Sequence, residues 1–211
     1  MTLRNITCAV TLCLLTLSGQ AVGKTEVPPY KNKSLSIEKR VDDLMGRMTL
    51  REKVLQLQNR GAGRLDEIDR IFNGESYGCT HEMGTTAAEC AAMYKELQQY
   101  MLTKTRLGIP IITSVEGIQG ILQNNCTLFP HALAQGSTFN PALIQRMTEA
   151  AGEEAKVIGI HQILSPVLDI ARELRWGRVE ETFGEDPYLI SEMGIAFING
   201  CLLYTSPSPR D

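Results

Sequence analysis

The sequence predicts an α/β fold with a parallel sheet, and three observations support this. Two short apolar runs, 111–115 and 161–170, are separated by amphipathic stretches of about 15 to 20 residues with helical spacing. Neither run alternates apolar with polar residues, which is typical of parallel strands buried on both faces. A closed eight-stranded barrel takes about 250 residues, so a chain of 211 residues indicates part of a barrel or a smaller open sheet.

The helices before the first run are predicted from their start signals. An apolar-periodic stretch begins at Ser36 and continues to Met48. Thr49, followed three residues later by Glu52, has the pattern of a capping box and starts a second, short helix. The segment 61–82 is rich in glycine and charge, so we expect a loop with a short helix near 65–72.

The later helices have equally clear signals. The stretch 86–105 is long and amphipathic. Asn140 with Pro141 starts the helix between the two apolar runs. Asp186 is predicted to cap the last helix, with Pro187 at its first position.

Both ends of the chain differ from its middle. Residues 1–23 have a charged start, an apolar stretch and small residues, as in a cleaved secretion signal, so we expect a secreted or periplasmic protein that leaves the membrane after cleavage. Residues 24–35 contain two adjacent prolines and are predicted to be a linker. Residues 201–211 change abruptly to a Ser- and Pro-rich sequence, which we interpret as a non-native tail on a domain spanning 36–200.

Charge and motifs exclude several classes of function. The formal net charge is −3, from 21 Lys and Arg against 24 Asp and Glu, so nothing indicates a nucleic-acid partner. His131 and His161 stand among apolar residues and are expected to be packed, and His81 near Cys79 does not make a zinc site. No phosphate loop or dinucleotide fingerprint occurs, so neither a metal nor a cofactor is predicted.

Two loops follow the apolar runs, where α/β proteins bind their ligands. The first, 114–120, places Glu116 before flexible glycines. Its carboxylate could accept hydrogen bonds from a hydroxylated ligand, or it could cap a helix or pair with an arginine; the spacing leaves both readings open.

The second loop, 172–187, holds three arginines, five acidic residues and the only tryptophan of the chain. Planar guanidinium groups and an aromatic ring suit sugar recognition. We assign Glu185 and Asp186 to the start of the last helix and expect some Glu–Arg pairs to be structural, while Arg178 stays open between the two roles.

At these loops the sequence resembles glycoside hydrolase family 3, the β-glucosidase and β-xylosidase family. The matching segments run in order through the chain. They are Val41-Asp42-Asp43-Leu44-Met45, Met48 to Leu57, Leu107-Gly108-Ile109-Pro110, Glu116-Gly117-Ile118-Gln119-Gly120, Phe129-Pro130, Phe139-Asn140-Pro141, Leu164 to Asp169, Arg175-Trp176-Gly177-Arg178 and Glu180 to Pro187.

The resemblance implies a (β/α)₈-like, TIM-type barrel that is truncated after roughly half its length. It also implies that Glu116 and Arg178 contact the sugar at the point of cleavage. The sequence departs from the family pattern at Glu116, often Asp, at Gln119, often His, and at 173–174, often Asp-Pro.

The family's nucleophile and acid/base carboxylates would lie beyond the end of this chain, so no catalytic residue is assigned within it. We therefore expect the N-terminal fragment of a secreted retaining β-glycosidase, inactive by itself. A β-glucosidase acting on terminal β-linked glucose of oligosaccharides or β-glucosides is the leading reading. A β-xylosidase or arabinosidase is the alternative within the family, and an inactive sugar-binding protein is the alternative of another class.

Overall fold

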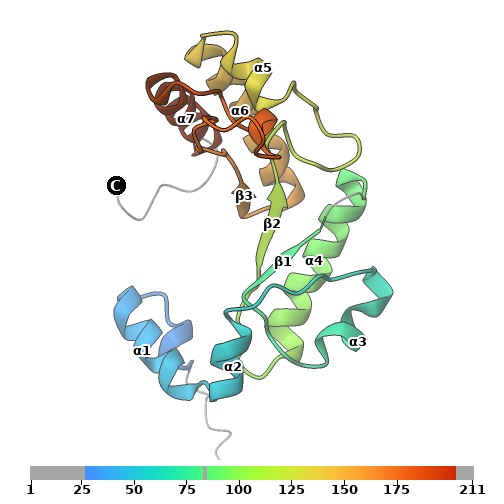
Figure 1. The fold of residues 1–211 in the computed structure, drawn as a ribbon. Coiled ribbons are helices and arrows are strands. Elements are labelled where there is room, and N and C mark those ends of the chain that lie inside the picture. Colours follow the sequence, from blue (N-terminus) through green and yellow to red (C-terminus); the bar gives the residue numbers. More distant parts are fainter. Residues whose placement is uncertain (1–26, 83–84, 203–211) are drawn as a thin grey trace, which may run out of the picture. The chain divides into compact units, whose positions relative to one another are not determined.

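The computed structural model describes residues 27–82 and 85–202 (Figure 1). The predicted signal, 1–23, and most of the predicted tail, 203–211, lie outside these residues. The chain divides into two compact units, one ending at Gly46 and the other beginning at Arg47. Each unit is described by itself.

The first unit consists of a short turn and one helix. The 3-10 helix η1, Pro29–Lys31, lies within the predicted linker, and α1, Ile37–Arg47, confirms the first predicted helix. Tyr30 joins the two, because its backbone N–H donates to Asp43 Oδ2 at 3.1 Å and its carbonyl accepts from Arg40 Nε at 3.0 Å. No residue of α1 is buried.

The second unit starts with the predicted capping box. Thr49 and Glu52 satisfy each other's backbone N–H groups at the start of α2, Leu50–Leu55. The 3-10 helix η2, Leu65–Glu67, and α3, Ile68–Phe72, confirm the short helix predicted in the glycine-rich segment.

A parallel sheet of three strands, in the order β1-β2-β3, organises this unit (Figure 1). β2, Ile112–Glu116, and β3, Gln162–Leu164, confirm the two predicted strands, although β3 is much shorter than the apolar run. β1, Cys79–His81, was expected to be part of a loop, and that prediction is wrong. Three residues with polar side chains carry no strand pattern; β1 exists because it pairs with β2, Cys79 opposite Ile112.

Helices cover one face of the sheet. Val115 of β2 and Ile163 of β3 pack into a core with α4, Ala87–Lys104, and α6, Pro141–Ile158. On the same strands Ile112 is 50% exposed and Leu164 is 41% exposed. The prediction that both faces are buried is therefore wrong for the described residues, because an apolar run does not reveal which elements cover each of its faces.

A second core joins three helices. α5, Ala132–Gly136, was not predicted; it packs with α6 and with α7, Pro187–Leu202. Asp186 Oδ1 accepts from the backbone N–H groups of Tyr188 and Leu189 at 2.7 and 3.2 Å, which confirms the predicted cap. The helix includes the first two residues of the predicted tail, and the foreign origin of that tail stays a prediction.

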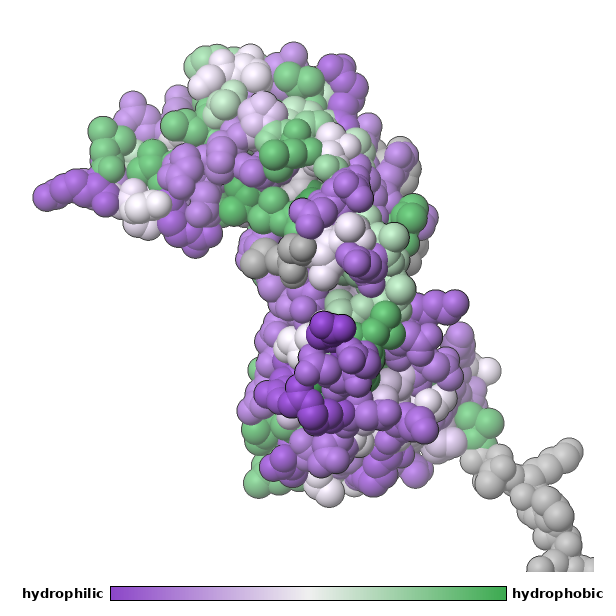
Figure 2. All heavy atoms as spheres, turned by 90° about the vertical axis from the view of Figure 1, so that its right-hand side faces the viewer, coloured by the Kyte–Doolittle hydropathy of each residue, from purple (hydrophilic) through white to green (hydrophobic). Residues whose placement is uncertain are grey.

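The surface in the view of Figure 2 is mostly hydrophilic, with patches of apolar residues between the polar ones. Within the part of the chain that the structure describes, every helix is too short or too polar to cross a lipid bilayer. The described cysteines, 79, 90, 126 and 201, are free thiols.

Candidate functional site

The first candidate residue, Glu116, is the last residue of β2, at the carboxyl end of the sheet. It lies opposite Leu164, the last residue of β3, so the loops after both strands begin at one edge. The loop after β2 is closed by hydrogen bonds from Leu122 N to Glu116 O, 3.2 Å, and from Phe129 N to Gln119 O, 2.8 Å. A side chain at Gly117 would collide with Ile163, which explains the glycine after Glu116.

Gln119 lies in this loop and has an unusual feature. Its side-chain oxygen is buried and has no hydrogen-bond partner among the described residues. Buried acceptors of this kind are rare because burial removes their water without replacing it. The position is one of those where the sequence departs from the family pattern.

The second candidate residue, Arg178, is held by a neighbouring carboxylate. Its Nε and Nη2 both donate to Glu181 Oε2, at 2.9 and 2.5 Å. The Arg178 side chain is 55% exposed, whereas that of Glu181 is 20% exposed. The hydrogen bond and the charge of Glu181 raise the pKa of Arg178, and the charges of Asp169 and Glu116 raise it further.

Glu116 and Arg178 are therefore within electrostatic reach of each other, although they come from loops far apart in the sequence. Glu116 lies at the carboxyl end of β2, and the segment that follows Arg178 runs beside the segment after β3, where Thr182 pairs with Val167. Asp169 and Glu181 complete the charged group and were not singled out from the sequence as binding residues. These residues provide carboxylate oxygens that accept hydrogen bonds and one guanidinium group with several N–H donors.

The turn that carries Glu181 is fixed by buried contacts. Thr182, fully buried, donates from Oγ1 to Val179 O at 2.9 Å and pairs with Val167. The backbone of Phe183 lies so close to Gly136 of α5 that a side chain at this glycine would overlap it. Glu181 thus stands on a rigid support.

A second arginine pair in the same loop lies in solvent. Arg175 donates from Nη2 to Glu173 Oε2 at 2.6 Å, and the two side chains are 89% and 57% exposed. The hydrogen bond from Arg175 lowers the pKa of Glu173 to about 2. The expected Glu–Arg pairs are thus present in this loop, one of them at its exposed surface. Trp176, which lies between the two arginines in the sequence, is partly exposed.

The two histidines expected to be packed are exposed, so that prediction is wrong. His161 satisfies its ring by a hydrogen bond instead: Nδ1 accepts from Thr113 N at 3.2 Å and lies 2.6 Å from Thr113 Oγ1. Apolar sequence neighbours did not reveal this, because the partner comes from β2. Among residues 27–82 and 85–202, no group of three His, Cys, Asp or Glu side chains is placed to hold a metal ion.

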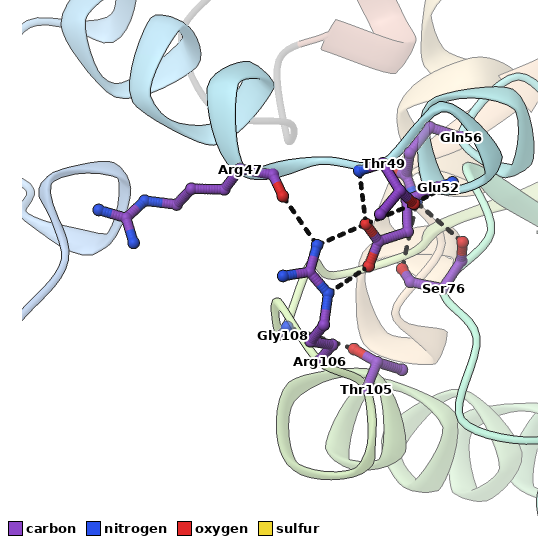
Figure 3. Close-up of polar contacts among 8 residues, drawn as sticks. All are labelled: Arg47, Thr49, Glu52, Gln56, Ser76, Thr105, Arg106 and Gly108. Carbon is purple, nitrogen blue, oxygen red and sulfur yellow. Dashed lines mark hydrogen bonds and ion pairs between the residues drawn. The ribbon is translucent and has the colours of Figure 1, made fainter.

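A separate polar network lies at the amino end of β2 (Figure 3). Arg106 donates to both carboxylate oxygens of Glu52, at 2.8 and 2.5 Å, and to the carbonyl of Arg47 at 2.8 Å. This pair lowers the pKa of Glu52 to about 2. The network borders a cavity of about 230 Å³. Since ligands of parallel sheets bind at the carboxyl ends of strands, we assign the network to stability.

Comparison with known proteins places this arrangement in a family. The profile of the glycosyl hydrolase family 3 N-terminal domain matches residues 49–202. β-Glucosidase C of Emericella nidulans is 34% identical over 191 residues, covering 82% of this chain and 31% of that protein. A periplasmic β-glucosidase/β-xylosidase of Dickeya chrysanthemi is 29% identical over 197 residues, covering 82% and 30%.

Solved structures are similar in fold. A β-glucosidase from Erythrobacter marinus superposes with a TM-score of 0.72 at 30% identity, over 82% of this chain and 24% of that one. A β-glucosidase of Listeria innocua in complex with laminaribiose gives a TM-score of 0.64 at 31% identity, over 80% and 24%. This chain spans a quarter to a third of the length of these relatives. It belongs to glycoside hydrolase family 3 and contains part of the family's N-terminal (β/α) barrel domain.

Proposed function

We propose that this chain is the N-terminal part of a secreted retaining β-glycosidase that releases terminal β-linked glucose from oligosaccharides or β-glucosides. The observation that carries the proposal is the position of Glu116 at the carboxyl end of β2 together with that of Arg178 in the loop after β3, which is joined to β3's continuation by the pairing of Thr182 with Val167. These are the two positions that, by resemblance to the family, contact the sugar at the point of cleavage.

The two side chains suit a pair of sugar hydroxyl groups. A hydroxyl donates one hydrogen bond and accepts others, so Glu116 accepts a hydrogen bond from it while Arg178 donates one to its oxygen or to that of a neighbour. Such contacts favour the transition state when they strengthen as the ring distorts during cleavage.

This chain supplies binding groups and not the reacting carboxylates. Retaining hydrolysis uses one carboxylate as nucleophile and a second group as acid and base, about 5 Å apart. We place both in the part of the full-length protein beyond this chain. The chain by itself is expected to be inactive.

A β-xylosidase or arabinosidase is the second candidate, and one observation favours keeping it: the Dickeya relative is both a β-glucosidase and a β-xylosidase. The sugars differ at the hydroxymethyl group of glucose, which xylose lacks. The choice therefore depends on the pocket around that group rather than on Glu116 and Arg178.

The first experiment is a long read of the source locus across codons 195–215. If the frame continues, the full-length protein is assayed on nitrophenyl β-glucoside, β-xyloside and α-arabinoside. We expect the glucoside to give the highest kcat/KM, and Glu116→Ala or Arg178→Ala to lower it by about 100-fold, as for loss of a charged hydrogen bond to a substrate. A higher kcat/KM for the xyloside would refute the proposed substrate. Wild-type activity in both variants would refute the proposed site.

If the frame ends at Asp211, the hypothesis of an inactive sugar-binding protein is tested instead by glucose titration of this chain.

Export is tested separately, by comparing the periplasmic and extracellular fractions of cells expressing the protein with and without residues 1–23. Retention of the intact protein in the cytoplasm would contradict secretion.

A further inference from the structure

Among the hydrogen bonds of the described residues, those of the Arg178 guanidinium go to Glu181. We infer that Glu181 is a positioning residue for ligand binding: it holds the Arg178 guanidinium in one orientation in the loop after β3. This inference rests on the proposed function, because it takes Arg178 as a residue that binds the ligand.

The hydrogen bonds leave Arg178 with donors to spare. Both bonds to Glu181 end on a single carboxylate oxygen, Oε2, and together they use the Nε–H and one Nη2–H. A guanidinium has five N–H groups, so three donors, two of them on Nη1, are not used by Glu181. A planar group fixed along one edge presents the opposite edge in a defined direction.

The exposed fractions of the two side chains show which of them holds the other in place. Glu181 is 20% exposed and ends the 3-10 helix η3, Val179–Glu181, next to the buried Thr182 and Phe183. Arg178 is 55% exposed. An arginine loses side-chain rotamer entropy when it is fixed. Fixing it before the ligand arrives removes that cost from binding.

The neighbouring pair provides a matched control. Arg175 and Glu173 form a comparable ion pair in the same loop, but both side chains are mostly exposed and Glu173 is not on the buried turn. Such surface pairs contribute little. Breaking this pair should leave ligand binding unchanged.

The test is glucose binding, measured by titration calorimetry on the full-length protein with the variants Arg178→Ala, Glu181→Ala, Glu181→Gln and Glu173→Ala. We expect Glu181→Ala to raise the Kd for glucose about tenfold, as for loss of a charged hydrogen bond, and Glu181→Gln, which keeps an acceptor, about threefold. Glu173→Ala should bind as the wild type does.

A spectroscopic signal separates positioning from general damage. The Nε–H resonance of Arg178, assigned by its loss in Arg178→Ala, should be protected from exchange in the wild type and Glu181→Gln but not in Glu181→Ala. If Glu181→Ala fails to fold, Glu181→Gln decides, and wild-type affinity in it overturns the inference.

Two further outcomes are distinguishable. Weak binding in Arg178→Ala with wild-type binding in Glu181→Ala overturns the positioning role alone. Wild-type binding in Arg178→Ala overturns the proposed site and the positioning role with it.

Discussion

Glu52 makes two stabilising contacts, one with the helix N-terminus and one with Arg106, and replacing it by Gln separates the two contributions. Its carboxylate accepts from Thr49 N at 2.8 Å in the capping box and receives two hydrogen bonds from Arg106 (Figure 3). The glutamine variant keeps an acceptor for Thr49 but loses the charge that Arg106 pairs with.

The magnitude follows from the pKa. Arg106 and Thr49 lower the pKa of Glu52 from 4.5 to about 2, which corresponds to at most about 3 kcal/mol. The Glu52 and Arg106 side chains are 25% and 55% exposed, so solvent screens the pair and we expect a loss of about 1 to 1.5 kcal/mol in Glu52→Gln.

The effect should depend on pH. Because the folded-state pKa is lowered, the charged pair stabilises the protein above pH 4.5, and this contribution is lost as the pH falls toward 2. The free energies of unfolding of wild type and Glu52→Gln, measured by urea denaturation with circular dichroism, should therefore differ most at pH 6, differ less at pH 3 and converge at about pH 2.

Glu89 provides the matched control. It forms the same capping box with Thr86 at the start of α4, with Oε2 accepting from Thr86 N at 2.9 Å and from Thr86 Oγ1 at 2.7 Å. No arginine is paired with it among the described ion pairs. Glu89→Gln should cost less than Glu52→Gln. Equal losses, or a Glu52 effect that does not change with pH, would show that the Arg106 pair contributes nothing and refute the reasoning.

Two other substitutions test separate parts of the structure. Asp186→Ala removes the cap of α7 and should lower the free energy of unfolding by about 1 kcal/mol in urea denaturation, whereas Asp186→Asn should retain most of it; equal losses would contradict the capping role. Gln119→Leu removes the unpaired buried oxygen, so the free energy of unfolding should stay the same or rise by about 1 kcal/mol. Clear destabilisation of the leucine variant would mean that the oxygen has a partner.

Local structure could be predicted because its signals lie close together in the sequence. Thr49 with Glu52, Asn140 with Pro141 and Asp186 with Pro187 each start a helix by contacts within three residues. β2 was predicted because Ile111, Ile112 and Val115 lie close together in one short segment. The α/β class followed from these elements, and the resemblance then indicated the partial barrel that the comparisons support.

The site was predicted only in part. Glu116 and Arg178 were identified by their place in the motifs, but nothing in the spacing showed that they lie within electrostatic reach. Glu181 could have been paired with Arg178 from its position three residues later, since such neighbours meet on a helical turn. That Glu181 is the less exposed partner, 20% against 55% for Arg178, could not have been predicted, because exposure depends on the tertiary surroundings of the turn.

The sequence by itself determined where the helices begin, which segments are apolar enough for strands, and which family the chain resembles. Only the tertiary structure decided that Cys79–His81 is a strand, that one face of the sheet is exposed among the described residues, and that Glu181 rather than Glu116 pairs with Arg178. The physical reason is the distance along the sequence over which each interaction acts. Caps and periodicity act within a few residues, whereas strand pairing, burial and the competition between charges depend on segments that only folding brings together.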